Sequence, residues 1–127
     1  MKSEEEWRRE LTADQFRILR QKGTEPPFRN AYFDNKRKGR YYCAGCGNEL
    51  FSSADKYDSG TGWPSFSRPV EPGAVEFHDD RTFGTTRTEV VCARCGGHLG
   101  HVFDDGPAPT GQRYCMNSGS LRFEEVK

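Results

Sequence analysis

The five cysteines of this 127-residue chain are the residues with the clearest chemistry. Four of them form two Cys-x-x-Cys pairs, each followed by a glycine: Cys43 with Cys46, and Cys92 with Cys95. Two pairs at this spacing can fill all four positions of a tetrahedral zinc ion. Because four protein ligands leave no open position on the metal, we expect one structural zinc ion that ties two distant parts of the chain together.

Two other interpretations of these pairs are less favoured. A redox-active Cys-x-x-Cys of the thioredoxin type needs one pair within a βαβ pattern, whereas this chain has two matched pairs and no such pattern. A zinc finger made by the second pair with His98 and His101 lacks the longer spacer that separates the ligand pairs of that motif. It would also leave the first pair without a role.

Cys115 is the cysteine outside the pairs, and a free cysteine is most often a small buried apolar residue. Its neighbours favour another role. Arg113 and Asn117 lie two residues away on either side, so on a strand the three side chains would share one face. Since a nearby guanidinium favours the thiolate over the thiol, we predict that Cys115 is a nucleophile which attacks a polar, oxygen-bearing substrate.

His98 and His101 lie close together in a glycine-flanked segment. A single histidine is more often a satisfied surface or core residue than a catalytic one, but two so close indicate a site. On a regular strand the two side chains would face opposite ways. The glycines permit a bulge that brings them together.

Trp63 lies in the segment 60–66, which is too rich in glycine and proline for the interior of a regular strand. A tryptophan in such a loop either covers a small core or forms the wall of an apolar pocket. A methyl or thioether group would suit that wall, because contacts between sulfur and aromatic rings are favourable.

The elements that must position these residues follow from capping signals and alternation. Ser3 and the glutamates after it predict a short helix, and Thr12 to Gln15 predicts a capping box that opens a second helix ending at Gly23. From Tyr32 onward the pattern predicts short strands near residues 40–43, 49–52, 74–78, 85–91, 98–103 and 113–123. The predicted fold is mainly β and antiparallel, one domain over residues 1–127 with short N-terminal helices in residues 1–25.

Charge and hydropathy limit the classes of partner. The 19 basic and 19 acidic residues give a net charge of zero, which argues against nucleic-acid or membrane binding through bulk electrostatics. No apolar run approaches the ~20 residues of a membrane span, and the N-terminus has no apolar segment typical of a secretory signal. We therefore expect a cytoplasmic monomer with reduced thiols.

Two non-enzymatic interpretations stay open at this level. One is a zinc-knuckle module that binds protein or nucleic acid and in which Cys115 is inert. Neutral net charge and the surroundings of Cys115 count against it. The other is a small zinc-containing chaperone.

Four motifs occur in one order: Cys-x-x-Cys, Ser-Gly-x-Gly-Trp-Pro-Ser-Phe, Cys-x-x-Cys-Gly-x-His-Leu-Gly-His-Val-Phe-Asp-Asp-Gly and Arg-Tyr-Cys-x-Asn-Ser. From about Leu11 to Phe123 the chain resembles the B-type methionine sulfoxide reductases, which reduce the R epimer of peptide-bound methionine sulfoxide. The resemblance implies a β-rich body of two antiparallel sheets with N-terminal helices and one structural zinc ion. It also implies that the substrates are oxidised proteins or peptides.

The resemblance assigns a role to each candidate residue. Cys115 matches the catalytic cysteine, and Trp63 matches the residue that holds the ε-methyl group of the substrate. Phe103 matches an apolar wall of the site. The polar residues around the sulfoxide match His98, His101, Arg113 and Asn117, and the zinc ligands match Cys43, Cys46, Cys92 and Cys95.

The chain departs from the pattern of many members at Thr61, where they carry a resolving cysteine. With four cysteines on zinc and one catalytic, none is left to form a disulfide with Cys115. We therefore expect that the sulfenic acid formed on Cys115 is reduced by an external thiol, either a small molecule or a thioredoxin-like protein.

Overall fold

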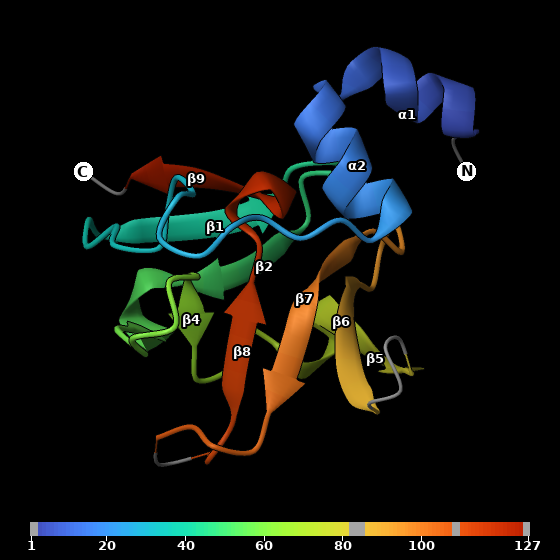
Figure 1. Cartoon of the computed structure of the whole chain (residues 1–127). Coiled ribbons are helices and arrows are strands. Elements are labelled where there is room, and N and C mark those ends of the chain that lie inside the picture. The colour runs from blue at the N-terminus through green and yellow to red at the C-terminus, as the bar shows by residue number, and fades with distance from the viewer. Residues whose placement is uncertain (1–2, 82–85, 108–109, 126–127) are drawn as a thin grey trace.

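The computed structural model describes residues 3–81, 86–107 and 110–125. In these ranges the helices α1 (Glu4–Glu10) and α2 (Ala13–Gln21) precede a series of short strands (Figure 1). The strands are β1 (Gly39–Cys43), β2 (Glu49–Ser52), β3 (Lys56–Tyr57), β4 (Ser65–Phe66), β5 (Val75–Asp80), β6 (Arg87–Cys92), β7 (His98–Phe103), β8 (Arg113–Met116) and β9 (Leu121–Glu125). The predicted strand 85–91 corresponds to β6, and its first residue, Thr85, lies outside the described residues.

Both helices begin as predicted. The hydroxyl groups of Ser3 and Thr12 accept the backbone N–H of the third helical residue, whose side chain reaches back to the cap, so each helix has a complete capping box. The second helix ends at Gln21, two residues before the predicted Gly23. Lys22 adopts the left-handed conformation with φ of 56°, and Gly23 donates its N–H to the carbonyl of Arg17 at 2.8 Å.

The strands form two antiparallel sheets, as expected. The smaller sheet has the order β2-β1-β9, and the larger has the order β3-β4-β8-β7-β6-β5. The segment 113–123, predicted as strand, contributes to both: β8 ends at Met116, a short 3-10 helix covers Ser118–Ser120, and β9 continues in the smaller sheet. The chain therefore leaves the larger sheet just after Cys115.

The core lies between the two sheets and is rich in aromatic side chains. Phe51 of the smaller sheet stacks on Phe66 of the larger at a centroid distance of 4.4 Å, and Tyr41 meets Phe66 edge-on at 5.1 Å. All three are fully buried. Such pairs add to the free energy that burial alone supplies, which suits a chain with few large aliphatic residues.

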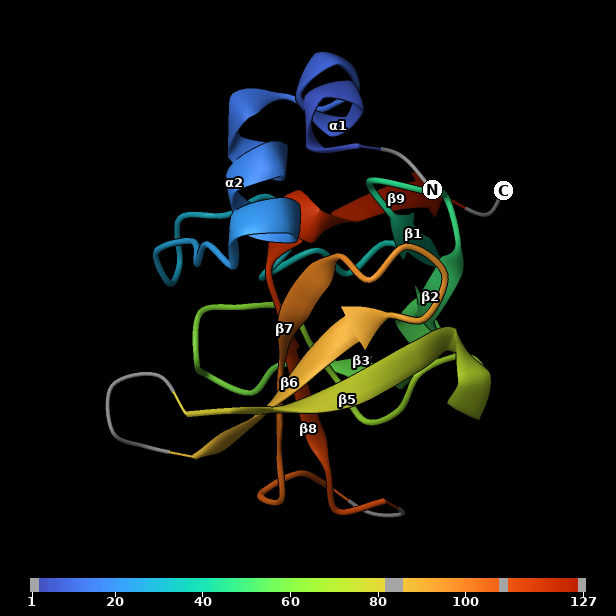
Figure 2. The same ribbon diagram turned by 90° about the vertical axis from the view of Figure 1, so that its right-hand side faces the viewer.

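The two helices lie at one end of the molecule (Figures 1 and 2). α2 contacts the start of β7 and the 3-10 helix 118–120, and its residues Phe16, Ile18 and Leu19 are buried. α2 and the linker that follows it (residues 22–38) therefore reach β7, which lies next to Cys115 in the larger sheet, and the 3-10 helix, which follows Cys115 in the chain. Within the described residues, no helix has the length and apolar character that crossing a membrane requires.

Candidate active site and metal centre

The two Cys-x-x-Cys pairs meet in space. The first pair encloses the turn between β1 and β2, and the second encloses the turn between β6 and β7. The four sulfur atoms lie within 4.8 Å of one another, with Cys43 Sγ at 3.7 Å from Cys95 Sγ and Cys46 Sγ at 3.5 Å from Cys92 Sγ. Four ligands about 2.3 Å from a tetrahedral zinc ion stand roughly 3.8 Å apart, so these cysteines could hold a metal ion of that size.

Glycines shape both turns around the sulfurs. Gly47 and Gly96 follow the pairs, have φ of 80° and 74°, and donate their N–H groups back to the carbonyls of Cys43 and Cys92. The next residue along, Gly97, donates its N–H to Cys95 Sγ at 3.4 Å, and the side-chain amide of Asn48 donates to Cys92 Sγ at 3.8 Å. Each turn is therefore compact enough for its two thiols to face the other pair.

Among the described residues, the cluster of possible metal ligands contains the four cysteines and neither His98 nor His101, and both histidine rings are bound to carboxylates. His98 Nδ1 lies 2.7 Å from Glu89 Oε2, and His101 Nε2 lies 2.8 Å from Asp80 Oδ2. The alternative metal site that would use these histidines with the second pair is therefore not the arrangement that the structure shows.

The expected bulge brings the histidines together. The pairing of β6 with β7 shifts register between Val90 and Val91, and the centroids of the His98 and His101 rings are 5.4 Å apart. His98 is buried, and this burial lowers its pKa although Glu89 opposes the shift. His101, unlike His98, lines an open hollow that Cys115 also lines.

Cys115 lies on β8 in register with Ser65 on one side and His101 on the other. Residues directly opposite on antiparallel strands share a face, so Cys115 and His101 project to the same side of the sheet. They open into a hollow of about 250 Å³. Its lining consists of Thr61, Trp63, Arg87, Gly100, His101, Phe103, Arg113, Cys115, Met116 and Asn117.

Burial dominates the acidity of the Cys115 thiol. Desolvation raises its pKa, while the Thr61 hydroxyl, 4.0 Å away, and the Arg113 guanidinium act in the opposite direction. Arg113 thus favours the thiolate as expected from the sequence, but burial outweighs it in the protein without substrate.

Arg113 is held in place by two partners. Its guanidinium makes a bidentate ion pair with Asp105, at 2.8 and 3.2 Å, and lies over the Phe103 ring with 4.4 Å between Cζ and the ring centroid. The ion pair lowers the pKa of the exposed Asp105 carboxyl. Phe103, expected as an apolar wall, therefore also supports the cation beside Cys115.

Asn117 and Trp63 are tied together by Glu25, in the linker after α2. The backbone N–H of Glu25 donates to Asn117 Oδ1 at 3.1 Å, and its carbonyl accepts the Trp63 indole N–H at 2.9 Å. Asn117 also donates its amide N–H to the carbonyl of Leu99 at 3.3 Å. The Asn117 side chain thus fixes the linker while it lines the hollow.

Glu25 also binds the 3-10 helix through its side chain. The carboxylate accepts the backbone N–H groups of Ser118 and Gly119, the latter at 3.0 Å. Burial raises its pKa, and these two hydrogen bonds act against the shift.

Sequence reasoning missed three of these supporting residues: Asp80, Glu89 and Glu25. Glu89 is buried and also forms an ion pair with Lys22 of the linker at 3.3 Å. In the sequence Glu25 precedes two prolines and the other two lie among other charged residues, so no local signal separates them from surface acids. Only the sheet register and the return of the linker bring them to the site.

A family model for the SelR domain matches residues 11–125. A relative from Leptospira interrogans, named peptide methionine sulfoxide reductase MsrB, is 59% identical over 124 residues, which cover 98% of this chain and 95% of that protein. The chain belongs to the B-type methionine sulfoxide reductase family.

Relatives of the same name extend across distant organisms. The protein from Acinetobacter baylyi is 58% identical, covering 97% of this chain and 88% of its own, and that from Methanosarcina mazei is 59% identical, covering 96% and 87%. The chain is thus an oxidoreductase of the B-type family. This overturns the interpretation as a non-enzymatic zinc-knuckle module or chaperone.

Among solved structures, the Mis18 'Yippee-like' domain superposes on the reductase with a TM-score of 0.57 at 18% identity, covering 72% of this chain and 99% of that one. At this identity the likeness concerns the fold alone.

Proposed function

We propose that this reductase acts on the R epimer of peptide-bound methionine sulfoxide and repairs oxidised proteins or peptides. The observation that carries the proposal is the pairing of Cys115 with His101 across two strands, inside a hollow that Trp63 also lines. A nucleophile, an acid–base group and an aromatic wall are the three parts that sulfoxide reduction at a methyl-bearing sulfur requires.

The Cys115 thiolate attacks the sulfoxide sulfur, and a histidine, directly or through water, protonates the sulfoxide oxygen. His101 is placed for this step because it reaches the hollow, whereas His98 lies behind it. The oxygen ends on the cysteine: the sulfoxide gains two electrons and becomes a thioether, and Cys115 loses two and becomes a sulfenic acid. Arg113 favours the thiolate, and Asn117 lines the same hollow.

Epimer selection follows from the position of Trp63. The indole N–H bond to Glu25 fixes the ring, so the ring can hold the substrate methyl group in one orientation. Only one epimer then presents its oxygen toward His101. Phe103 adds a second apolar surface to the hollow.

The four-cysteine cluster holds one structural zinc ion in this proposal. The sulfur spacing fits zinc, and four thiolates saturate a tetrahedral ion. The cluster joins a turn of each sheet, so the metal stabilises residues 1–127 as one domain.

Recycling requires a thiol from outside the chain. All five cysteines are free of disulfides, and four of them belong to the cluster. A small thiol, or a thioredoxin-like protein, reduces the sulfenic acid: two thiols are oxidised to a disulfide and water leaves. We further propose that the reductase is a cytoplasmic monomer, an environment in which such thiols are present.

The test is turnover of each epimer of a blocked methionine sulfoxide, with dithiothreitol and with thioredoxin in parallel. We expect reduction of the R epimer alone, and none by Cys115→Ser. Mass spectrometry after one turnover without reductant should find an added oxygen on Cys115. Activity that survives in Cys115→Ser would remove the nucleophile assignment, and a stable Cys115 to Cys43 disulfide with loss of zinc would refute recycling without a resolving cysteine.

A further inference from the structure

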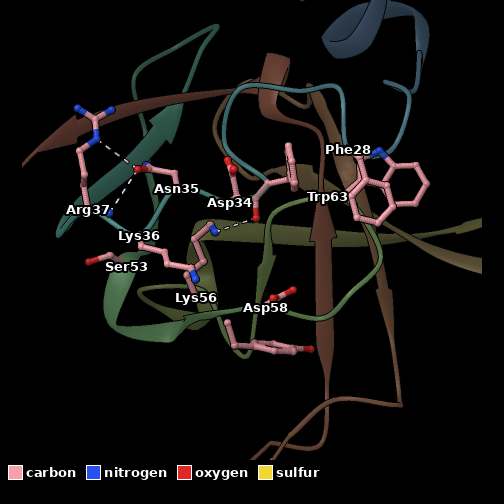
Figure 3. Close-up of a pocket in the computed structure, with 12 residues that line it drawn as sticks. Phe28, Asp34, Asn35, Lys36, Arg37, Ser53, Lys56, Asp58 and Trp63 are labelled. Atoms are coloured by element: carbon pink, nitrogen blue, oxygen red, sulfur yellow. Dashed lines mark hydrogen bonds between the residues drawn. The ribbon is translucent and has the colours of Figure 1, made fainter.

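A second hollow adjoins the catalytic one and has no part in the chemistry described above. It has a volume of about 380 Å³ and lies between the linker 28–37, the segment 53–58 and Gly62–Trp63 (Figure 3). Trp63 lines both hollows. The two hollows therefore share the Trp63 side chain as part of their walls.

The wall next to the catalytic hollow is aromatic. Phe28 and Trp63 lie at the same end of the second hollow, while Lys56, Asp58 and Arg37 lie away from them (Figure 3). The Phe28 ring meets Phe33 edge-on at 5.6 Å. Apolar surface at this end and charged groups at the other suit a ligand with one apolar side chain and a polar backbone.

Phe28 is held in this place at a conformational cost. Its φ is 63°, in the left-handed region that bulky residues rarely adopt, and the side chain is 58% exposed. Backbone strain of this kind persists where the surrounding structure fixes it, and it gathers at ligand sites. Here the strained backbone places the Phe28 ring, which is largely exposed in the protein without a ligand.

Gly62 makes this placement possible. Its carbonyl accepts the Phe28 N–H at 2.8 Å and the Asn30 side-chain amide at 2.9 Å. A Cβ at position 62 would come within 2.8 Å of the Phe28 ring and within 2.7 Å of its backbone nitrogen. The linker thus packs directly on the loop that carries Trp63, and the two aromatic residues are set by one backbone contact.

We propose that this hollow is a substrate subsite that takes an apolar side chain, aromatic or aliphatic, within two residues of the methionine sulfoxide in the oxidised polypeptide. The proposal rests on the proposed function, because the methionine sulfoxide must occupy the catalytic hollow. Two residues of extended chain span up to about 7 Å, enough to pass the rim formed by Trp63. Phe28 and Trp63 then bury the neighbouring side chain between them.

The test compares a blocked (R)-methionine sulfoxide residue with blocked peptides in which Phe or Gly occupies the first or the second position on either side of the sulfoxide. Burial of a side chain in the hollow predicts that kcat/KM for the better Phe peptide exceeds that for its Gly counterpart by about tenfold, mainly through KM. Phe28→Gly accepts the left-handed φ and removes the ring. In this variant the preference should fall to about twofold, while turnover of the blocked residue stays unchanged.

Phe77→Ala is the matched control, since it removes another exposed aromatic ring, 48% accessible on β5, that lines neither hollow. It should keep the full preference. Equal kcat/KM for Phe and Gly peptides in the unaltered enzyme overturns the subsite and leaves the proposed function intact. A preference for Phe that survives Phe28→Gly also overturns the subsite. The same holds if Phe28→Gly changes only the rate of recycling by thioredoxin. No turnover of the blocked residue would remove the proposed function itself, and the subsite with it.

Discussion

The acidity of Cys115 is set by opposing effects within a few ångströms. Burial raises the pKa of the thiol, and the Thr61 hydroxyl and the Arg113 guanidinium hold it back. Arg113 can do so because Asp105 and Phe103 fix its position. Cys115, the nucleophile of the proposed reaction, is therefore mostly a thiol at neutral pH in the protein without substrate.

Alkylation should show this balance. Because the pKa is raised, the rate at which iodoacetamide labels Cys115 is expected to keep rising with pH beyond the range of an ordinary cysteine near 8.5. Replacing Arg113 by Met removes the favourable charge and should slow labelling several-fold at a given pH, whereas Arg113→Lys keeps the charge and most of the rate. The measurement is labelling of the Cys115 peptide by mass spectrometry. A profile that levels off below pH 7 would contradict the dominance of burial.

His101 and Asp80 act as a pair. His101→Gln should lower kcat by about 10²–10⁴-fold, the usual contribution of a general acid or base. Asp80 touches no substrate in the proposed reaction. It orients the His101 ring and also pairs with Arg87 at 3.6 Å, so Asp80→Asn should lower kcat by roughly tenfold to a hundredfold with little change in KM. His78→Gln on the exposed side of β5 is the control and should leave both constants unchanged. A change confined to KM in Asp80→Asn would argue against an orienting role.

At the scale of elements, the linker after α2 connects parts of the site that the sheets alone leave apart. Glu25 reaches Trp63 through its carbonyl, Asn117 through its N–H, and the 3-10 helix 118–120 through its carboxylate. Because the Glu25 carboxylate binds the 3-10 helix, the backbone of Glu25 stays where its carbonyl can accept the Trp63 indole N–H.

Glu25→Gln should loosen this connection, because an amide can accept only one of the two N–H groups and opposes the other with its own. We expect KM for (R)-methionine sulfoxide to rise about threefold to tenfold and discrimination between epimers to fall, while alkylation of Cys115 is unchanged. Glu76→Gln, an exposed acid on β5, is the control. Epimer discrimination that stays complete in Glu25→Gln would mean that Trp63 is held without this linker.

Some of these elements could be predicted from the sequence, and others could not. The helix starts at Ser3 and Thr12 were predictable, because capping is decided within four residues. The four-cysteine cluster was predictable as well, because ligand spacing is a local signal with one dominant chemical meaning. The sequence predicted the bulge, where register shifts between Val90 and Val91, only as a possibility that nearby glycines permit.

The supporting acids were beyond prediction for a physical reason. Glu89 reaches His98 through strand pairing, and Glu25 reaches Ser118 across 93 positions of sequence. Neither contact leaves a periodic trace in the sequence. The burial of Cys115 was beyond prediction in the same way: the Arg113 neighbour is visible in the sequence, but the depth of burial, which raises the pKa of the thiol, is not.

On the scale of the whole molecule, the four-cysteine cluster joins the two sheets outside their shared core. Cys43 ends β1 of the smaller sheet, and Cys92 ends β6 of the larger. A domain of this size buries a limited area, and a bound structural metal adds its binding free energy to folding.

Cys46→Ser should therefore weaken the fold rather than the chemistry. With one ligand lost, we expect zinc content below one ion per chain and a fall in Tm of about 10 °C or more, which corresponds to roughly 3 kcal/mol. Cys115→Ser is the matched control and should keep both zinc and Tm. The measurements are metal analysis and thermal unfolding. A Cys46→Ser protein with unchanged Tm would show that the sheets hold together without the metal.

The contact between Asp80 and His101 also bears on the route of the proton in the proposed turnover. An ionised Asp80 can only accept the hydrogen bond that joins it to His101 Nε2, so a neutral ring that donates to it has a bare Nδ1, which must receive a proton before it gives one. The proton that the Cys115 thiol loses can thus travel through His101 to the sulfoxide oxygen, and the sulfenic acid ends with the proton that the thiol began with. A single turnover in unbuffered solution should then leave the external pH unchanged, and so should the restoration of Cys115 by two protonated thiols, which yields a disulfide and water.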